Sequence, residues 1–154
     1  MTDVFRYERL LHWGECDPAG LIFFPNYARW IVEGVNLLFL SGGLDPVGSV
    51  SGAVRGGLPA VACEMQFLSP AKLHDQVMHE IAVAKLGRKS ITFHHRFFRG
   101  DVCLAEAKDV RVWVQEEGGE MQSIPIPEKA RNMLEPFLNR HEASGSTRLE
   151  ESGA

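Results

Sequence analysis

The sequence has little that would bind nucleic acid and no segment that would cross a membrane as a helix. Its 16 lysine and arginine residues are outnumbered by 20 aspartate and glutamate residues, for a formal net charge of -4. A nucleic-acid surface needs an excess of positive charge. No run approaches the roughly 20 apolar residues of a transmembrane helix, and the first residues (MTDVFR) lack the basic and apolar regions of a signal peptide. We expect a cytoplasmic protein that binds neither nucleic acid nor membrane.

Cysteine is also scarce, which argues against a disulfide scaffold and a zinc site. Cys16, Cys63 and Cys103 cannot all pair within one chain, and their spacing matches no zinc-ligand motif. The remaining composition is ordinary for one globular domain, since 45% of the 154 residues are hydrophobic and 23% are charged.

Residues 25–41 predict one helix that is apolar on most sides. Its first residue is proline, which is favoured in a first turn, and two glycines follow it, which tolerate the left-handed conformation at a helix end. Only Arg29, Glu33 and Asn36 are strongly polar. Because a helix that is apolar all round is buried, we expect this one at the centre of the fold.

Alternation of apolar and polar residues predicts strands before and after this helix in the sequence. The expected strands cover residues 4–13, 61–67, 76–86, 89–99 and 102–115, with an ordered loop over 44–58. Short glycine-containing links at 87–88 and 100–101 are typical of hairpins, so these strands should be antiparallel neighbours. A last helix is expected over 128–139, weakened by Pro136, and disorder from residue 140 onward.

This order predicts an α+β fold in which an antiparallel sheet wraps one central helix. We expect a single domain over residues 1–139 and a disordered tail over 140–154. One sheet of this size covers the helix on one side only. The uncovered apolar face and the edge strands therefore predict self-association.

Residues 14–30 (GECDPAG-LIFF-PNYARW) form the most informative stretch. They resemble the 4-hydroxybenzoyl-CoA thioesterase family of hotdog-fold enzymes, in which an Asp-Pro-Ala-Gly turn and a hydrophobic step precede a Pro-Asn-Tyr-x-x-Trp helix start. Residues 67–75 (FLSPAKLHD) and 124–127 (IPIP) resemble other segments of that family. The resemblance implies hydrolysis of an acyl-CoA thioester without metal or other cofactor. It also implies a homotetramer of two dimers, with each active site at a dimer interface.

By this resemblance Asp17 is the catalytic carboxylate, and the backbone amide of Phe24 is the oxyanion donor. The residues themselves are compatible with that chemistry. A carboxylate in a turn before a helix start lies near backbone N–H groups that have no helical acceptor, and the helix dipole favours a developing oxyanion there. Whether Asp17 acts as nucleophile or as general base on water stays open. Taken alone, Asp17 before a proline is an ordinary turn residue.

The family places an acid two residues after the helix tryptophan, where it binds the ring hydroxyl of the substrate. This chain has Val32 at that position. The difference predicts an apolar acyl pocket lined by Phe23, Phe24, Trp30 and Val32, which would suit a benzoyl, another aromatic or a medium-chain acyl group.

Three further residues are candidates for substrate binding. Glu33 lies on the apolar helix, where a carboxylate is costly unless it is paired or used, so we expect a paired or substrate-side residue. Arg88 and Lys89 lie in a link between strands. By resemblance, basic residues at this link meet the phosphates of coenzyme A.

Other functions stay open at this stage. Glu33 could be the catalytic acid, as in a second class of hotdog thioesterases, or the chain could be a catalytically silent module that binds acyl-CoA or acyl-carrier protein. A hotdog dehydratase needs a histidine and an acid that the motif does not supply. Cys16 has no histidine placed to activate it, and His94 and His95 point to opposite faces of a strand, which disfavours a metal site.

Overall fold

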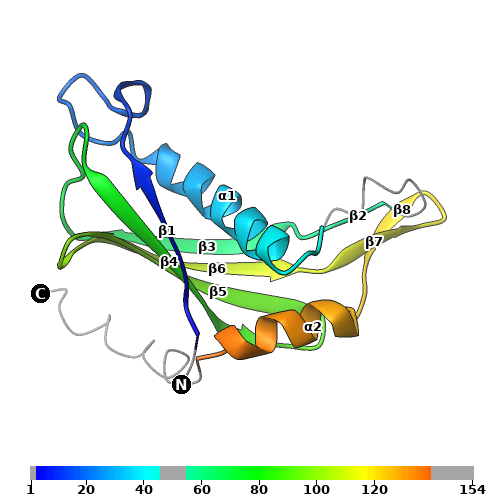
Figure 1. Cartoon of the computed structure of the whole chain (residues 1–154). Helices are drawn as coiled ribbons and strands as arrows, with labels where there is room; N and C mark the ends of the chain where they lie inside the picture. Colours follow the sequence, from blue (N-terminus) through cyan, green and yellow to red (C-terminus); the bar gives the residue numbers. More distant parts are fainter. Residues whose placement is uncertain (1–2, 46–54, 140–154) are drawn as a thin grey trace, which may run out of the picture.

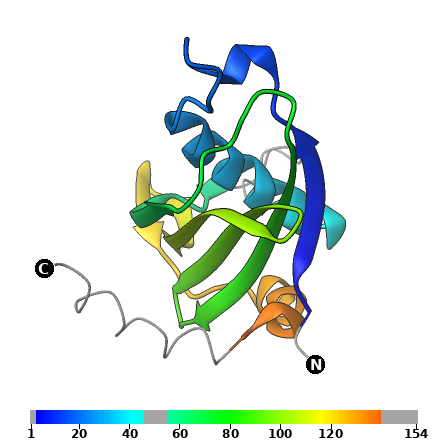
Figure 2. The same cartoon turned by 90° about the vertical axis from the view of Figure 1, so that its left-hand side faces the viewer.

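The computed structural model describes residues 3–45 and 55–139, and a curved antiparallel sheet with one long helix dominates these ranges (Figure 1). The sheet has the strand order β1–β4–β5–β6–β3. The strands are β1 (Phe5–Leu10), β3 (Ala60–Phe67), β4 (Gln76–Leu86), β5 (Ser90–Arg99) and β6 (Val102–Val112). Viewed from its end, the sheet curves around helix α1 (Figure 2). This is the expected hotdog arrangement of a sheet wrapped around a helix.

Helix α1 (Pro25–Ser41) has the bounds that the sequence predicts. Its buried face includes Trp30, Leu38 and Phe39, each 0% exposed. As expected for a single chain, the sheet covers only one side of the helix, and Val32 and Leu40 on the other side are 48% and 64% exposed. The exposed side combines these apolar residues with Arg29 and Asn36.

A second, small sheet was not predicted. It consists of β2 (Gly56–Gly57), β7 (Val114–Glu117) and β8 (Glu120–Ser123), in the order β2–β7–β8. The strand expected over 102–115 breaks at Trp113, whose N–H donates to the carbonyl of Lys89 at 2.9 Å. Gly118 and Gly119 form the hairpin turn, with φ values of 61° and 87° that a two-residue turn of this hand requires.

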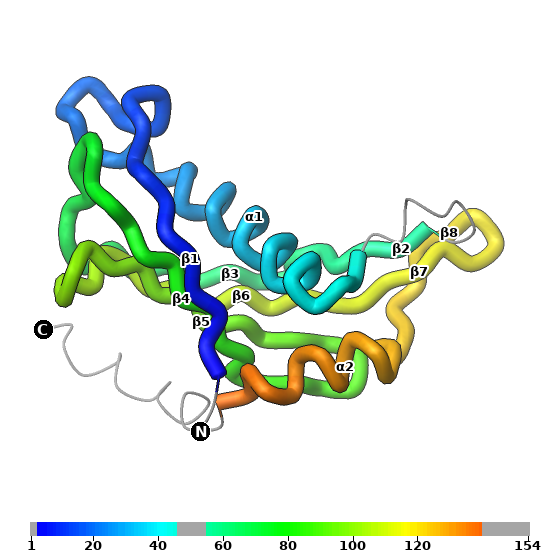
Figure 3. Tube along the Cα trace, viewed as in Figure 1, coloured from blue at the N-terminus to red at the C-terminus, as the bar shows by residue number. Residues whose placement is uncertain are grey.

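The first and last segments that the structure describes lie side by side, with the start of β1 next to the end of the last helix (Figure 3). The N–H of Asp3 donates to the carbonyl of Pro136 at 3.0 Å. The predicted last helix is shorter than expected, with α2 over Glu128–Leu134 and a 3-10 turn, η2, over Glu135–Phe137. The first strand is also shorter, and a 3-10 turn, η1 (Trp13–Glu15), follows it. The expected tail over 140–154 and most of the expected loop over 44–58 lie outside the described residues.

A chain of buried polar side chains crosses the interface between the sheet and α1. The hydroxyl of Tyr7 lies 2.8 Å from Nδ1 of His79, whose Nε2 lies 2.9 Å from Nδ1 of His95. His95 Nε2 lies 3.5 Å from Oδ2 of Asp109, which accepts a 2.8 Å hydrogen bond from Nε of Arg111. Both histidines are 0% exposed. Buried polar groups are tolerated when they are paired in this way.

These histidines predict a loss of stability in mild acid. Burial, followed by the nearby His95 and Arg9, lowers the pKa of His79 to about 2, and burial also lowers the pKa of His95. Below about pH 6.5 the two histidines bind protons in the unfolded chain but not in the folded chain. The free energy of unfolding therefore decreases as the pH falls below about 6.5. The slope should approach about 1.4 kcal/mol per pH unit for each histidine. Urea unfolding at several pH values between 7.5 and 5 measures this pH dependence of the free energy of unfolding.

A matched pair of variants isolates the buried group. His79→Gln should flatten this pH dependence, whereas Thr92→Ala, on the outer face of β5, removes no titrating group and should leave it as in the wild type. A free energy of unfolding that does not change between pH 7.5 and 5 would contradict the prediction.

Candidate active site

Asp17 and the start of helix α1 meet at one cavity of about 280 Å³. Phe24 and Tyr27 of the helix line it on one side, and Phe67 with residues 68–71 lines it on the other. Phe67 packs edge-on against Phe24, with ring centroids 5.8 Å apart. The two residues that the sequence assigns to catalysis therefore face the same, largely apolar space.

The Asp17 carboxylate is held by its own turn. Its Oδ1 accepts hydrogen bonds from the N–H groups of Ala19 at 2.9 Å and Leu21 at 3.2 Å. Gly20 adopts a φ of 77°, a left-handed conformation that glycine permits without strain. Oδ2 has no hydrogen-bond partner among the described residues. Asp17 is thus a turn residue with one carboxylate oxygen left free, so its structural role does not exclude a chemical one.

The first turn of α1 leaves one backbone donor available. Asn26 N–H donates to the carbonyl of Phe23 and Tyr27 N–H to that of Phe24, at 2.9 and 3.0 Å. Pro25 has no N–H, and within the described ranges the N–H of Phe24 meets no acceptor. This amide lies at the positive end of the helix dipole, where a developing oxyanion is favoured.

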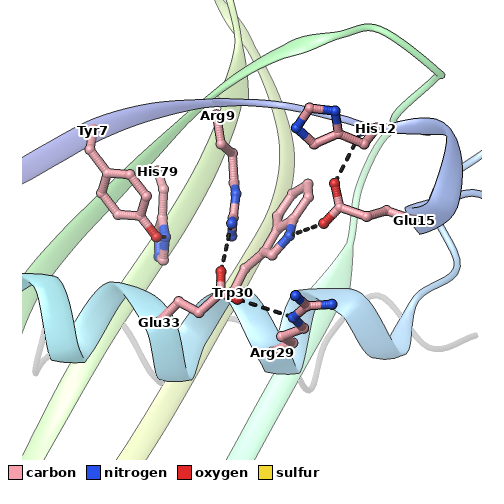
Figure 4. A network of polar contacts seen from close by, with 8 residues as sticks. All are labelled: Tyr7, Arg9, His12, Glu15, Arg29, Trp30, Glu33 and His79. Atoms are coloured by element: carbon pink, nitrogen blue, oxygen red, sulfur yellow. Dashed lines mark hydrogen bonds and ion pairs between the residues drawn. The ribbon is translucent and has the colours of Figure 1, made fainter.

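Glu15 ties the Asp17 turn to helix α1, and sequence analysis did not single it out. Its Oε2 accepts a 2.7 Å hydrogen bond from the indole Nε1 of Trp30, and its Oε1 accepts one of 3.1 Å from the N–H of His12 (Figure 4). Its carbonyl accepts from the Phe23 N–H at 2.9 Å and the Asn26 side-chain amide at 2.8 Å. An acid in a turn is usually solvated, so the pattern alone gave no signal.

The four residues expected to line one acyl pocket do not share a cavity in this chain. Phe24 lines the Asp17 cavity, Phe23 is 54% exposed beside it, and Trp30 is fully buried in the core. Val32 lines a different cavity of about 530 Å³, near the small sheet. Eight residues separate Phe24 from Val32 along the helix, which corresponds to about 12 Å at 1.5 Å per residue.

Glu33 is a paired residue that does not line the Asp17 cavity. Its Oε2 lies 2.6 Å from Nη2 of Arg9 and its Oε1 lies 3.0 Å from Nε of Arg29 (Figure 4). Partial burial alone would raise the pKa of Glu33, but the hydrogen bonds from the two arginines lower it. The Arg9 guanidinium also stacks 4.4 Å from the centre of the Trp30 ring. A carboxylate with both oxygens bound is a poor candidate for the catalytic acid.

Arg88 and Lys89 lie in the link after β4, and the Asp17 turn lies near the other end of this strand. The Asp17 turn bridges to Lys72, shortly before β4 begins, whereas the Arg88 link follows the last residue of β4. Ten steps along an extended strand correspond to about 33 Å. The link is fixed by Arg131 of α2, whose Nη2 donates to the carbonyl of Gly87 at 2.6 Å.

The remaining candidates have structural environments. Burial, followed by the negative charges of Asp17 and Glu15, raises the pKa of Cys16, which disfavours a nucleophilic thiolate. His95 is buried while His94 is on the other face of β5, as predicted. Within residues 3–45 and 55–139 no three potential ligands are grouped to hold a metal, and no helix there could cross a membrane.

Comparison with known proteins agrees with this geometry. The sequence model of the thioesterase-like superfamily matches residues 11–134. The chain is 32% identical over 127 residues to 4-hydroxybenzoyl-CoA thioesterase of Pseudomonas sp. (strain CBS-3), covering 78% of this chain and 89% of that protein. It is 30% identical over 139 residues to 1,4-dihydroxy-2-naphthoyl-CoA hydrolase of Prochlorococcus marinus (strain MIT 9515), covering 87% and 91%.

The fold is also similar to that of solved structures. A crystal structure of a 4-hydroxybenzoyl-CoA thioesterase mutant complexed with 4-hydroxybenzoyl-CoA superimposes with a TM-score of 0.75 at 25% sequence identity. The superposition covers 85% of this chain and 98% of the other. The family match spans most of the chain, and the sheet and the central helix are those of a hotdog protein. The chain therefore belongs to the thioesterase-like superfamily.

Proposed function

We propose that this protein, a thioester hydrolase, is a cytoplasmic acyl-CoA thioesterase that releases coenzyme A and a free aromatic or medium-chain acid. The observation that carries the proposal is that Asp17, with one free carboxylate oxygen, and Phe24, with a free backbone amide, line the same cavity. Cys16, Cys63 and Cys103 are free thiols, which suits a reducing compartment. The two relatives named above, which act on aromatic acyl-CoA thioesters, support the substrate class.

The chemistry needs only these two groups. The thioester carbonyl oxygen accepts a hydrogen bond from the Phe24 amide, which polarises the carbonyl carbon and stabilises the tetrahedral oxyanion. As a nucleophile, Asp17 forms a mixed anhydride while the carbon–sulfur bond breaks, and water then hydrolyses the anhydride. As a general base, Asp17 takes a proton from the attacking water and returns it to the leaving thiolate. Both routes consume one water and release acid and thiol.

Two separations support an active site shared by two copies of the chain. A benzoyl group is much shorter than the roughly 12 Å along the helix between the Phe24 amide and Val32. The roughly 33 Å along β4 that separates the Asp17 end from Arg88 and Lys89 exceeds the reach of the pantetheine arm of coenzyme A. Val32, Arg88 and Lys89 can therefore serve the same substrate as Asp17 only if they belong to another copy.

Strand β3 offers the edge along which two copies can pair. It pairs with β6 on one side only, and Val61 and Phe67 on it are 61% and 53% exposed. Phe67 at one end borders the Asp17 cavity, while residues 58–59, just before the other end, border the Val32 cavity. Antiparallel pairing of two β3 strands would bring the first cavity of one copy to the second cavity of the other. We propose this dimer, and two such dimers in a tetramer.

Substitution of Asp17 tests the catalytic assignment directly. Asp17→Asn should lower kcat by about 100- to 10,000-fold in a thiol-release assay on a panel of acyl-CoA substrates, because the amide can neither attack nor accept a proton. Circular dichroism should show an unchanged fold. Asp101→Asn, in the exposed β5–β6 turn, is the matched control and should keep wild-type kcat. If Asp17→Asn turns over normally, Asp17 is only a turn residue.

If Arg88 and Lys89 contact coenzyme A, removing their side chains should raise KM. Replacing both by alanine should raise KM by about tenfold, with a smaller effect on kcat, because such contacts bind ground and transition states alike. The effect should shrink at high salt, since exposed charges are screened. Lys108→Ala, on the outer side of β6, is the control. An unchanged KM in the double variant would contradict these contacts and move the phosphate site elsewhere, for example to Arg55.

The oligomeric state tests the shared site. Light scattering should give about four times the 17.2 kDa mass of one chain. Val61→Lys places a charge on the pairing edge, which blocks strand pairing, so it should reduce the mass and the thioesterase activity together. Glu120→Lys, in β8, should reduce neither. A stable monomer at micromolar concentration that retains full activity would refute the shared site.

A further inference from the structure

Arg111 brings a charged group to the otherwise apolar cavity beside Val32. It lines this cavity of about 530 Å³ and is only 6% exposed. Its Nε donates to Oδ2 of Asp109 at 2.8 Å and its Nη1 donates to the carbonyl of Leu58 at 3.3 Å. Nη2 has no partner among the described residues and is not one of the fully buried nitrogens. It is therefore the nitrogen that remains for a ligand in the cavity.

Asp109 holds the Arg111 guanidinium in place. Asp109 is 1% exposed and lies between Arg111 and His95, in the chain of polar contacts beneath the helix. The two hydrogen bonds, one of them to a buried carboxylate, hold the side chain in this orientation. Such fixed donors are the ones that discriminate between ligands, because they cannot relax when their acceptor is missing.

The surroundings of Arg111 define the chemistry of the ligand. The helix contributes Val32 and Val35 to the cavity, and the small sheet contributes Val114 and Met121. An apolar ligand with one oxygen fits these walls. A carboxylate fits less well, because Asp109 already balances the charge of Arg111 and a second anion in an apolar site is costly.

We propose that this cavity holds the far end of the substrate's acyl group and that Arg111 Nη2 donates a hydrogen bond to a neutral oxygen there. The preferred substrates are then acyl-CoA thioesters whose apolar acyl group ends in a carbonyl, ether or hydroxyl oxygen. This inference rests on the proposed function, since the acyl group reaches the cavity from the Asp17 of a second copy.

The proposal revises the expectation of an entirely apolar pocket. Val32 removes the carboxylate that would accept a hydrogen bond from a ring hydroxyl. Arg111, however, supplies a donor and has no acceptor. Recognition in this chain therefore depends on an oxygen that accepts a hydrogen bond, whether or not that oxygen carries a hydrogen.

A matched pair of substrates tests this without altering the protein. 4-Methoxybenzoyl-CoA and 4-ethylbenzoyl-CoA have the same length, and only the first has an oxygen where the second has a methylene. We expect kcat/KM of the wild-type protein to favour the methoxy substrate by about tenfold or more, because the ethyl group leaves a buried donor unpaired. Equal kcat/KM values would overturn the inference and leave the proposed thioesterase intact. Hydrolysis of no acyl-CoA at all would overturn both.

Two variants assign the preference to Arg111. Arg111→Lys keeps a positive charge beside Asp109 but loses the planar fork that serves three partners at once. It should lower kcat/KM for the methoxy substrate about tenfold more than for the ethyl substrate. Arg96→Lys, on the outer face of β5, should leave the ratio unchanged. A preference that survives in a folded Arg111→Lys protein would overturn the role of Arg111. If this variant does not fold, the wild-type substrate ratio still decides the proposal.

Discussion

The position of helix α1 on the sheet is set at Gly34, where no side chain can be placed. A β-carbon there would lie 2.5 Å from Cε1 of His79 and 2.8 Å from Cδ1 of Ile81. The helix therefore approaches the sheet as closely as its backbone permits, directly over the buried histidines. This contact sets how closely the helix lies against β4, which carries both of these side chains. Val32, two residues earlier on the helix, is 48% exposed and lines the second cavity.

The elements that sequence periodicity predicted correctly are those that bury one continuous face. Helix α1 and strand β4 have the predicted bounds because most of their inward-facing residues are apolar and repeat at the helical and strand periods. The small sheet was missed because its strands are short, and β8 is exposed throughout. The Gly118-Gly119 pair was its one usable signal.

The parts of the site that the sequence did not reveal depend on contacts between distant residues. The partners of Glu33 and Trp30 became evident only once β1 and η1 were placed against the helix. The sequence contains a clearer signal for Arg111. In β6, residues 105, 107, 109 and 111 all face inward, and the last two are charged. Two charges on the inward face of a strand are a signal of a buried polar network.

The break at Trp113 separates the five-stranded sheet from the small sheet. Beyond this residue the chain leaves the main sheet, and the walls that β7 and β8 give to the Val32 cavity belong to a separate hairpin. Substitutions at Met121 or in the hairpin turn can therefore reshape the cavity without disturbing the packing of the helix on the five-stranded sheet. The hairpin side of this cavity and the packing of the helix on the main sheet are thus set by separate parts of the chain.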